Sequence, residues 1–218
     1  MDRIAAATAA LLASTALAQA GGIERNAQSP AILFEEGTYV ELGYTYADPA
    51  VSGVQGIPGG AASPAGSQSG DVSPAFNHAS LSFRTDITEQ LSFALMFDEP
   101  VGADVDYAGI GAAAGYLYTL GTGSQAEISS RQVTAALRYE FDTGFSVYGG
   151  LRGVTADGNV SLFNGYTMEA EGSDELGYMI GAAYERPNIA LRVSLTYYSA
   201  TTHDFTATEA SGGAGPFN

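Results

Sequence analysis

The sequence predicts an all-β protein: an antiparallel transmembrane β-barrel that is incomplete, with about seven strands, and a short N-terminal plug segment. Three observations predict this fold. The chain begins with the pattern of an export signal, apolar and polar residues alternate over most of the chain after residue 37, and tight turns alternate with long connections. A hydrophobic period of two is typical of strands whose two faces meet different surroundings.

The composition of the 218 residues excludes several other classes of protein. Lys+Arg total 8 and Asp+Glu total 24, so the formal net charge is 8 − 24 = −16. Proteins that bind nucleic acid neutralise phosphates with clustered basic residues, so nucleic acid is not an expected partner. The chain has no Cys, which excludes a disulfide scaffold, a thiolate zinc site and a cysteine nucleophile.

Residues 1–20 have the pattern of a secretory signal peptide. An apolar run rich in Ala and Leu covers 4–18, and Ala18-Gln19-Ala20 forms a small-x-small cleavage pattern before Gly21. The run is shorter than the roughly twenty apolar residues that span a bilayer. A short buried N-terminal helix is the alternative reading. We expect export to the cell outer membrane, with a plug over 21–37 and a partial barrel over 38–218.

Seven segments carry the alternation that predicts strands. They are 40–46, 79–83, 91–97, 133–141, 145–151, 176–184 and 189–197. With their flanks, most are about nine to twelve residues long, which is the length of a tilted strand that crosses a hydrocarbon core. Tight turns are expected at 86–89, 142–144 and 186–188, and long loops over 47–75, 99–127, 156–174 and from 201 onward. Short turns on one side and long loops on the other are typical of outer-membrane barrels.

The charged residues of these segments avoid the apolar faces. Eight of them occupy the opposite face: Glu41, Arg84, Asp98, Arg138, Glu140, Arg152, Glu185 and Arg192. A charge that faces lipid at mid-depth costs about 2–4 kcal/mol, so this face is expected to line the lumen. The equal numbers of acids and Arg predict Arg–carboxylate pairs across the lumen.

Several segments also carry a resemblance to a known family. They are GGIER at 21–25 with QSPA at 28–31, LSF at 91–93 leading into FDEP at 97–100, YGGLR at 148–152, and GAAYE at 181–185 through ALRV at 190–193 to TYYS at 196–199, followed by His203. Over residues 21 to about 205 the chain resembles the long-chain fatty acid transporter family of outer-membrane proteins, which includes aromatic-hydrocarbon channels. The resemblance implies a monomeric barrel of about fourteen strands with an N-terminal plug. Because seven strands leave an unpaired edge, we interpret the chain as roughly the N-terminal half of such a transporter.

The functional hypothesis is passive uptake of hydrophobic small molecules, with no enzymatic activity, catalytic residue, metal or cofactor. The expected partners are the ligand, outer-membrane lipid and lipopolysaccharide, and the protein is expected to be a monomer. Candidate ligand-binding residues are Leu33 and Phe34 in the plug, Met96, Tyr148 and Met179 at lumen positions, and Leu162, Phe163 and Tyr166 in a loop. Self-packing of the loop is the alternative for the last three.

A further expectation concerns the end of the third predicted strand, at Asp98, Pro100 and Gly102. Proline cannot donate to a strand ladder and glycine weakens a strand, so pairing should break or bulge there. The resemblance implies that such a kink opens the wall sideways; a strand that simply ends at the rim is the alternative. A structural or adhesive barrel, or a general porin, remains the alternative function.

Overall fold

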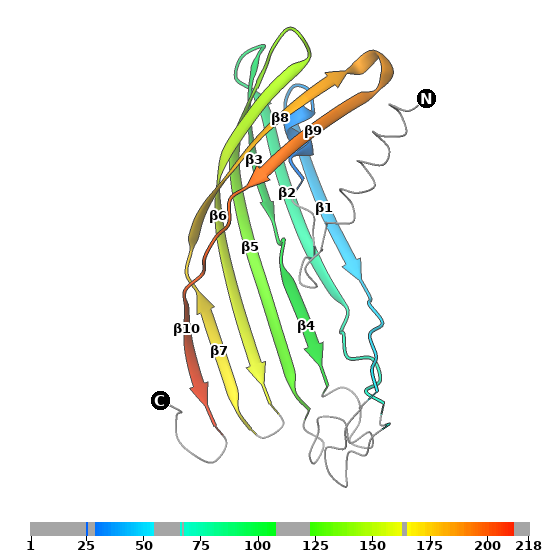
Figure 1. Ribbon diagram of the computed structural model, residues 1–218, viewed down its shortest axis with the longest axis vertical. Coiled ribbons are helices and arrows are strands. Elements are labelled where there is room, and N and C mark those ends of the chain that lie inside the picture. The colour runs from blue at the N-terminus through cyan, green and yellow to red at the C-terminus, as the bar shows by residue number, and fades with distance from the viewer. Residues whose placement is uncertain are drawn as a thin grey trace, which may run out of the picture.

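The computed structural model describes residue 25, residues 29–54, residue 66, and residues 68–107, 123–162 and 165–211. These residues form one antiparallel sheet that is curled into a half-barrel (Figure 1). The predicted signal peptide, most of 21–28 and Phe163 lie outside the described residues. Within the described part of the chain, no helix is both long and apolar enough to cross a membrane.

The described residues form ten strands and two short 3₁₀ turns. The turns are η1 (Ala31–Phe34) and η2 (Pro187–Ile189). The strands are β1 (Tyr39–Ala47), β2 (Phe76–Asp86), β3 (Leu91–Asp98), β4 (Gly102–Asp106), β5 (Gln125–Glu140), β6 (Phe145–Ser161), β7 (Thr167–Gly172), β8 (Glu175–Arg186), β9 (Leu191–Tyr198) and β10 (Phe205–Ala210).

The ten strands occupy seven positions across the sheet, which we call rows. Three of the rows are interrupted and consist of two strands each. Both β3 and β4 pair with β5, both β7 and β8 pair with β6, and β9 and β10 pair with β8 and β7 respectively. The seven expected segments therefore correspond to the seven rows. Tight connections join β2 to β3, β5 to β6 and β8 to β9, as the sequence predicts. We call this side of the sheet the turn end and the opposite side the loop end.

The structure corrects the predicted long loops. The segments 99–127, 156–174 and 201 onward contain β4, the start of β5, the end of β6, β7 and β10. The convex positions of these strands are polar, for example Glu127, Asp157 and Glu169, so the hydrophobic alternation is lost although the ladder continues. Backbone pairing does not require an apolar face. Hydrophobic alternation in the sequence therefore detects only the part of a strand whose outer face is apolar, and it misses the polar continuation.

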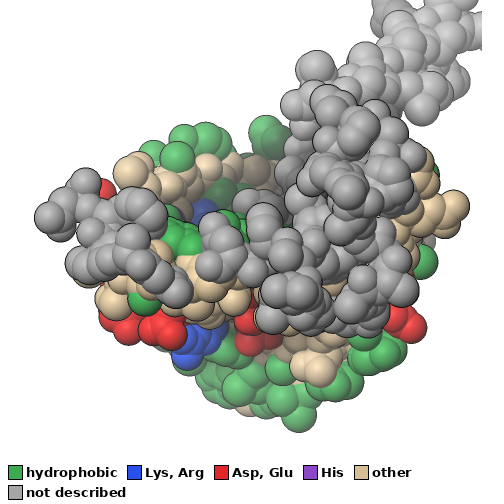
Figure 2. Space-filling model, turned by 90° about the horizontal axis from the view of Figure 1, so that it is seen from below, with side chains coloured by type: hydrophobic (Ala, Val, Ile, Leu, Met, Phe, Trp, Pro, Cys, Tyr) green, Lys and Arg blue, Asp and Glu red, His purple; other side chains and the backbone are tan. Residues whose placement is uncertain are grey.

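The two faces of the sheet differ as expected. Residues that lie opposite each other in a ladder, and every second residue along a strand, point to the same face of the sheet. By this rule all eight charged residues expected in the lumen lie on the concave face, together with the buried Ala94 and Ala136. Large exposed hydrophobic side chains cover the convex face, among them Leu42, Leu151 and Leu195. Seen from the loop end, Figure 2 shows this apolar surface beside a group of acidic side chains. The structure thus has a polar-lined interior and an apolar exterior band.

Both lateral edges of the sheet lack a neighbouring strand in the described part of the chain. β1 pairs with β2 alone, β9 with β8 alone, and β10 with β7 alone. The backbone N–H and C=O groups along these outer edges therefore have no ladder partner there. Such an edge can stay in lipid only if another strand satisfies it.

Candidate functional site

An apolar cluster fills the concave face near the turn end. Five of the eight predicted ligand-binding residues meet in it: Leu33, Phe34, Met96, Tyr148 and Met179. The cluster also contains Ile32 and three alanines from β3, β5 and β8, and Leu33 and Met179 are 0% and 1% exposed. The η1 turn supplies its centre: residues 32–34 are buried against the concave face, and the other members among the described residues come from strands. A ligand could enter this volume only by displacing the side chains that now pack there.

Tyr148 fixes the position of the cluster on the sheet. It lies directly opposite Gly181 on β8, and a Cβ at Gly181 would come within 2.3 Å of the Tyr148 ring. The ring can therefore lie flat across β8, and its hydroxyl reaches Thr196 Oγ1 on β9 at 2.7 Å. The hydroxyl also donates to the carbonyl of Leu195 at 3.4 Å, and the ring meets that of Phe34 in an edge-to-face arrangement with centroids 5.6 Å apart. Three rows and the η1 turn are joined by this one side chain.

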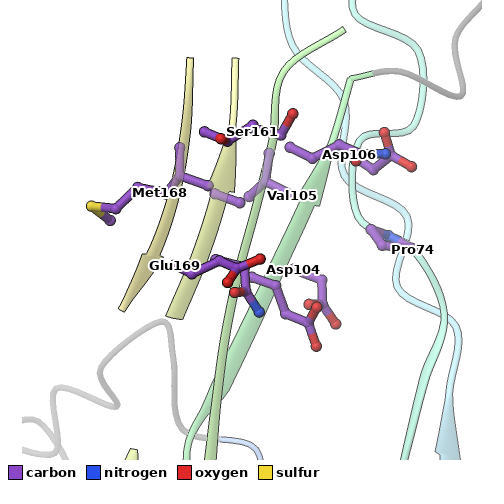
Figure 3. A pocket seen from close by; sticks show the side chains of 13 residues that line it. Pro74, Asp104, Val105, Asp106, Ser161, Met168 and Glu169 are labelled. Atoms are coloured by element: carbon purple, nitrogen blue, oxygen red, sulfur yellow. The ribbon is translucent and has the colours of Figure 1, made fainter. Parts of the chain in front are cut away.

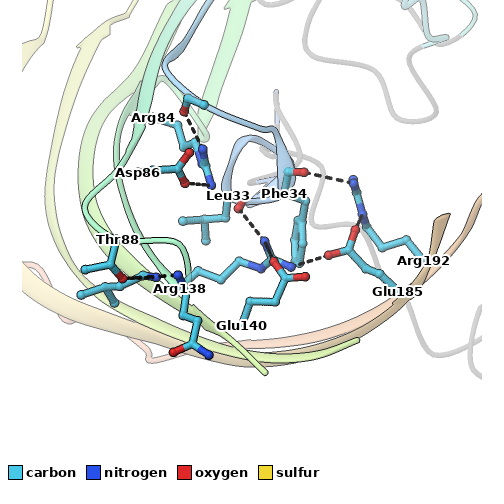
Figure 4. A network of polar contacts seen from close by, with 12 residues as sticks. Leu33, Phe34, Arg84, Asp86, Thr88, Arg138, Glu140, Glu185 and Arg192 are labelled. Atoms are coloured by element: carbon cyan, nitrogen blue, oxygen red, sulfur yellow. Dashed lines mark hydrogen bonds and ion pairs between the residues drawn. The ribbon is translucent and has the colours of Figure 1, made fainter. Parts of the chain in front are cut away.

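Arginine side chains hold the segment that carries η1 from three rows of the sheet (Figure 4). Arg84 on β2 donates to the carbonyl of Gly37 at 2.5 Å. Arg138 on β5 donates to the carbonyl of Leu33 at 3.5 Å, and Arg192 on β9 donates to that of Phe34 at 3.4 Å. The last two guanidiniums also lie 4.7 and 4.6 Å from the centre of the Phe34 ring, within cation–π range.

Acidic side chains neutralise these arginines. Glu185 contacts both Arg138 and Arg192, the latter at 2.7 Å, and Glu140 lies 3.0 Å from Arg138. Arg138 is only 5% exposed, so its charge needs these partners. The predicted Arg–carboxylate pairs across the interior are therefore present around η1.

Arg152 departs from that pattern. Its Nε and Nη2 donate to the amide oxygen of Gln132 at 3.1 and 2.8 Å, and its guanidinium lies 5.0 Å from the ring of Tyr198. Gln132 in turn donates to Asp98 at 3.5 Å. A neutral amide thus lies between Arg152 and Asp98, two of the eight charged residues expected in the lumen. Sequence reasoning missed Gln132, although its position on the polar face of β5 is a signal that could have found it.

The loop residues proposed for ligand binding lie far from the cluster. Leu162 and Tyr166 sit at the β6–β7 connection, where the Leu162 N–H donates to the Tyr166 carbonyl at 2.8 Å. At about 3.3 Å per residue, roughly 45 Å of β6 separates them from Tyr148. Desolvation and the neighbouring Glu209 carboxylate raise the pKa of Tyr166. The eight candidates therefore fall into two groups at opposite ends of the sheet, with Phe163 outside the described residues.

The predicted break at Asp98, Pro100 and Gly102 is present. β3 ends at Asp98 and β4 begins at Gly102, and the register on β5 shifts by one residue between Asp98↔Gln132 and Gly102↔Ser129. Pro100 is fully buried, and its carbonyl accepts a hydrogen bond from the backbone N–H of Arg25 at 2.9 Å. The row therefore bulges within the sheet and continues beyond Pro100, which excludes a strand that simply ends there.

A shallow pocket lies at the loop end, across β4, β5, β6 and β7. Its volume is about 460 Å³, and its lining includes Asp104, Asp106, Glu127 and Glu169 (Figure 3). Figure 3 shows that Met168 and Glu169 point to opposite sides of β7. Among the described residues, no three His, Asp or Glu side chains form a group that could hold a metal ion.

A nearby loop contact at the same end is stabilised by a carboxylate. The backbone N–H groups of Val51 and Ser73 donate to Asp71 Oδ1 at 3.0 and 3.2 Å, and these hydrogen bonds lower the pKa of Asp71. The contact ties the two arms of the β1–β2 connection together near the isolated bridge between Val54 and Gln68.

The chain matches no protein-family model and no curated protein in the comparisons made.

Proposed function

We propose that the protein is an outer-membrane channel for hydrophobic small molecules, such as long-chain fatty acids or aromatic hydrocarbons, which pass by diffusion. The observation that carries the proposal is an apolar cluster inside a half-barrel whose exterior band is also apolar, while the eight charged residues expected in the lumen face inward. An apolar exterior suits lipid, because a charge at mid-depth would cost about 2–4 kcal/mol. An apolar interior site suits an uncharged or weakly polar ligand rather than a sugar or an ion.

The proposed route uses three regions. Leu162, Phe163 and Tyr166 capture the ligand at the loop end, the cluster around Phe34 receives it, and the break at Pro100 releases it sideways into the bilayer. Burial of apolar surface provides the driving force, at about 25 cal/mol per Å². Lateral release is favourable because a fatty ligand that emerged into water would lose the burial that drew it into the channel.

The remaining parts of the proposal concern the setting. The signal-like residues 1–20 support export, and the segment around η1 serves as the plug of the channel. The resemblance of the chain to long-chain fatty acid transporters supports the same assignment. The partners are the ligand, outer-membrane lipid and lipopolysaccharide, and the channel works as a monomer without chemistry of its own.

Uptake of a fluorescent dodecanoic acid by cells that express the protein tests the proposal. Met179→Gln places a polar side chain in the cluster, and Met168→Gln makes the same change on β7 at the loop end. We expect Met179→Gln to slow uptake and Met168→Gln to leave it near that of the unmodified protein. Equal passage of sugars would instead indicate a general porin, and absence of any uptake would indicate a structural or adhesive barrel.

A further inference from the structure

A group of polar side chains borders the apolar cluster on the side that faces the loop end. Thr134 on β5 lies directly opposite Met96, a member of the cluster, and also opposite Arg152 on β6. Two residues closer to the loop end, Asp98 on β3 lies directly opposite Gln132 on β5. We call Asp98, Gln132, Thr134 and Arg152 the polar belt. The belt gives the apolar cluster a polar boundary on the concave face of the half-barrel.

Two buried atoms of the polar belt lack a hydrogen-bond partner among the described residues. They are Oδ1 of Asp98 and Oγ1 of Thr134, and the Thr134 residue is only 3% exposed. The other carboxylate oxygen of Asp98 accepts the hydrogen bond from Gln132 at 3.5 Å. Buried polar atoms in proteins are nearly always hydrogen-bonded, because an unpaired one has lost its contact with water without a replacement. The belt therefore has the capacity to bind one further polar group.

The register places these two atoms on neighbouring strands. Asp98 and Thr134 are diagonal neighbours, since Asp98 is paired with Gln132 and Thr134 is paired with Met96. Residues in this relation lie about 7–8 Å apart on the same face, so one small group between their side chains can contact both. A hydroxyl is complementary to the pair, because it can donate to the carboxylate oxygen of Asp98 and accept from the hydroxyl of Thr134.

The charges of the polar belt disfavour a carboxylate in the same place. A ligand carboxylate has no hydrogen to donate to Asp98 and would meet its negative charge. The guanidinium of Arg152 is already engaged: it donates to Gln132 through Nε and Nη2 and to the Ser199 carbonyl through Nη1 at 3.4 Å. A hydrocarbon would leave both unpaired atoms as they are. The belt is therefore suited to a neutral hydroxyl rather than to either alternative.

Met96 is the part of the apolar cluster that a ligand would displace most easily. Its side chain is unbranched and has three rotatable bonds, so it adapts to a new neighbour at low cost. The rings of Phe34 and Tyr148, in contrast, hold each other in an edge-to-face contact. An apolar ligand body in the place of the Met96 side chain would bring an attached hydroxyl next to Thr134, because these two residues are paired across the ladder.

We propose that Asp98 and Thr134 form a subsite for the hydroxyl group of a hydrophobic ligand, such as a phenol or a long-chain alcohol, whose apolar part replaces the Met96 side chain in the cluster. The inference rests on the proposed function, because it names the head group of the molecules that the channel carries. Phenols and alcohols bind more tightly than hydrocarbons of the same size, and carboxylates bind least tightly.

Three fluorescent ligands with the same ring system test the subsite: 2-naphthol, 2-methylnaphthalene and 2-naphthoate. Their binding to the full chain in detergent micelles at neutral pH is measured by fluorescence titration, with partition into protein-free micelles subtracted. We expect the unmodified protein to bind 2-naphthol about fivefold more tightly than 2-methylnaphthalene, as one neutral hydrogen bond provides. Binding of 2-naphthoate should be the weakest of the three.

Two variants change the subsite without removing a hydrogen bond of the described fold. Thr134→Val keeps the shape of the side chain and removes a hydroxyl that has no partner there, and it should lower the affinity ratio of 2-naphthol to 2-methylnaphthalene about fivefold. Asp98→Asn retains an oxygen for Gln132 and removes the charge, so it should raise the affinity for 2-naphthoate relative to 2-naphthol about tenfold. The matched control is Thr208→Val, because Thr208 is exposed on β10 opposite Glu169 on the convex face.

The subsite would be wrong if the unmodified protein binds 2-naphthol no more tightly than 2-methylnaphthalene, or if Thr134→Val gives the same affinity ratio as Thr208→Val. Tighter binding of 2-naphthoate than of 2-naphthol would also overturn it, because a carboxylate would then occupy the belt beside Arg152. Absence of binding of all three ligands contradicts it as well.

Uptake by cells keeps this inference apart from the proposed function. The fluorescent dodecanoic acid is compared with the alcohol that has the same label and chain. Uptake of either molecule by a protein that shows no preference for 2-naphthol contradicts the subsite alone. A clear preference for 2-naphthol in a protein that takes up neither molecule contradicts the proposed function alone.

Discussion

Glu185→Gln should loosen the η1 turn from the sheet. The two carboxylate oxygens of Glu185 serve two arginines, Arg138 and Arg192, and both arginines also contact carbonyl groups and the aromatic ring of the turn. A glutamine side chain offers one neutral acceptor in place of two charged ones. The substitution therefore weakens one contact and removes the other.

The magnitude follows from the two contacts. A hydrogen bond to a charged group contributes about 1.5–3 kcal/mol and a neutral one about 0.5–1.5 kcal/mol. Arg192 is 41% exposed and regains water, and Arg138 keeps Glu140 at 3.0 Å, so the loss is smaller than for an isolated buried pair. We expect a local cost of about 2 kcal/mol, which is about a thirtyfold change in an equilibrium constant.

Amide hydrogen exchange, measured in detergent micelles, reads this local opening. The N–H groups of Leu33 and Glu35 donate to Pro30 and Ile32 carbonyls at 3.0 and 3.2 Å, so they exchange when the turn opens. Glu185→Gln should speed their exchange about thirtyfold. Glu171→Gln is the matched control, because Glu171 lies on the convex face opposite Asp157. Exchange of the turn in Glu185→Gln that stays close to that of the control would refute the reasoning.

Three further predictions concern export, the outer edges of the sheet, and the β6–β7 connection that is proposed to capture the ligand. The exported protein should begin at Gly21, because the cleavage pattern ends at Ala20, and N-terminal sequencing of membrane-extracted protein that finds residue 1 instead would contradict export. The isolated chain should stay trypsin-sensitive in detergent and show no heat-dependent gel shift, because both outer edges of its described sheet are unpaired; a protease-resistant monomer would count against this. Serine at Leu162, Phe163 and Tyr166 together should weaken binding of the fluorescent fatty acid by several kcal/mol at most, because each substitution removes apolar surface that the ligand would bury, and unchanged affinity would indicate that the loop packs only on itself.

Much of the interior could be predicted from the alternation of residues. Met96, Tyr148 and Met179 were expected at inward positions, and the structure brings them into one cluster with Leu33 and Phe34. The prediction worked because the parity of a strand position fixes which face its side chain occupies. The break near Pro100 was predictable for a similar reason, since proline has no N–H to contribute to the ladder.

The contacts of Arg25 with Phe76 and Asp104 had no comparable signal. Both residues are far from Arg25 in the sequence, and neither alternation nor spacing relates them to it. The position of Gln132 on the polar face of β5 indicates an inward side chain, but its contact with Arg152 on the neighbouring strand could not be predicted from that position alone. Such contacts depend on which strands are neighbours and on their register, and a single strand does not contain that information.

By itself, the sequence determined the class of the fold, the seven rows and the two faces of the sheet, because hydrophobic alternation is a local property of each segment. Only the tertiary structure decided where the rows continue as polar strands, how one residue of register is lost between Asp98 and Gly102, and which side chains meet across the concave face. The physical reason is that ladder hydrogen bonds form between backbones whatever the side chains are. Polar strands and distant contacts therefore become visible only when the neighbouring rows are in place.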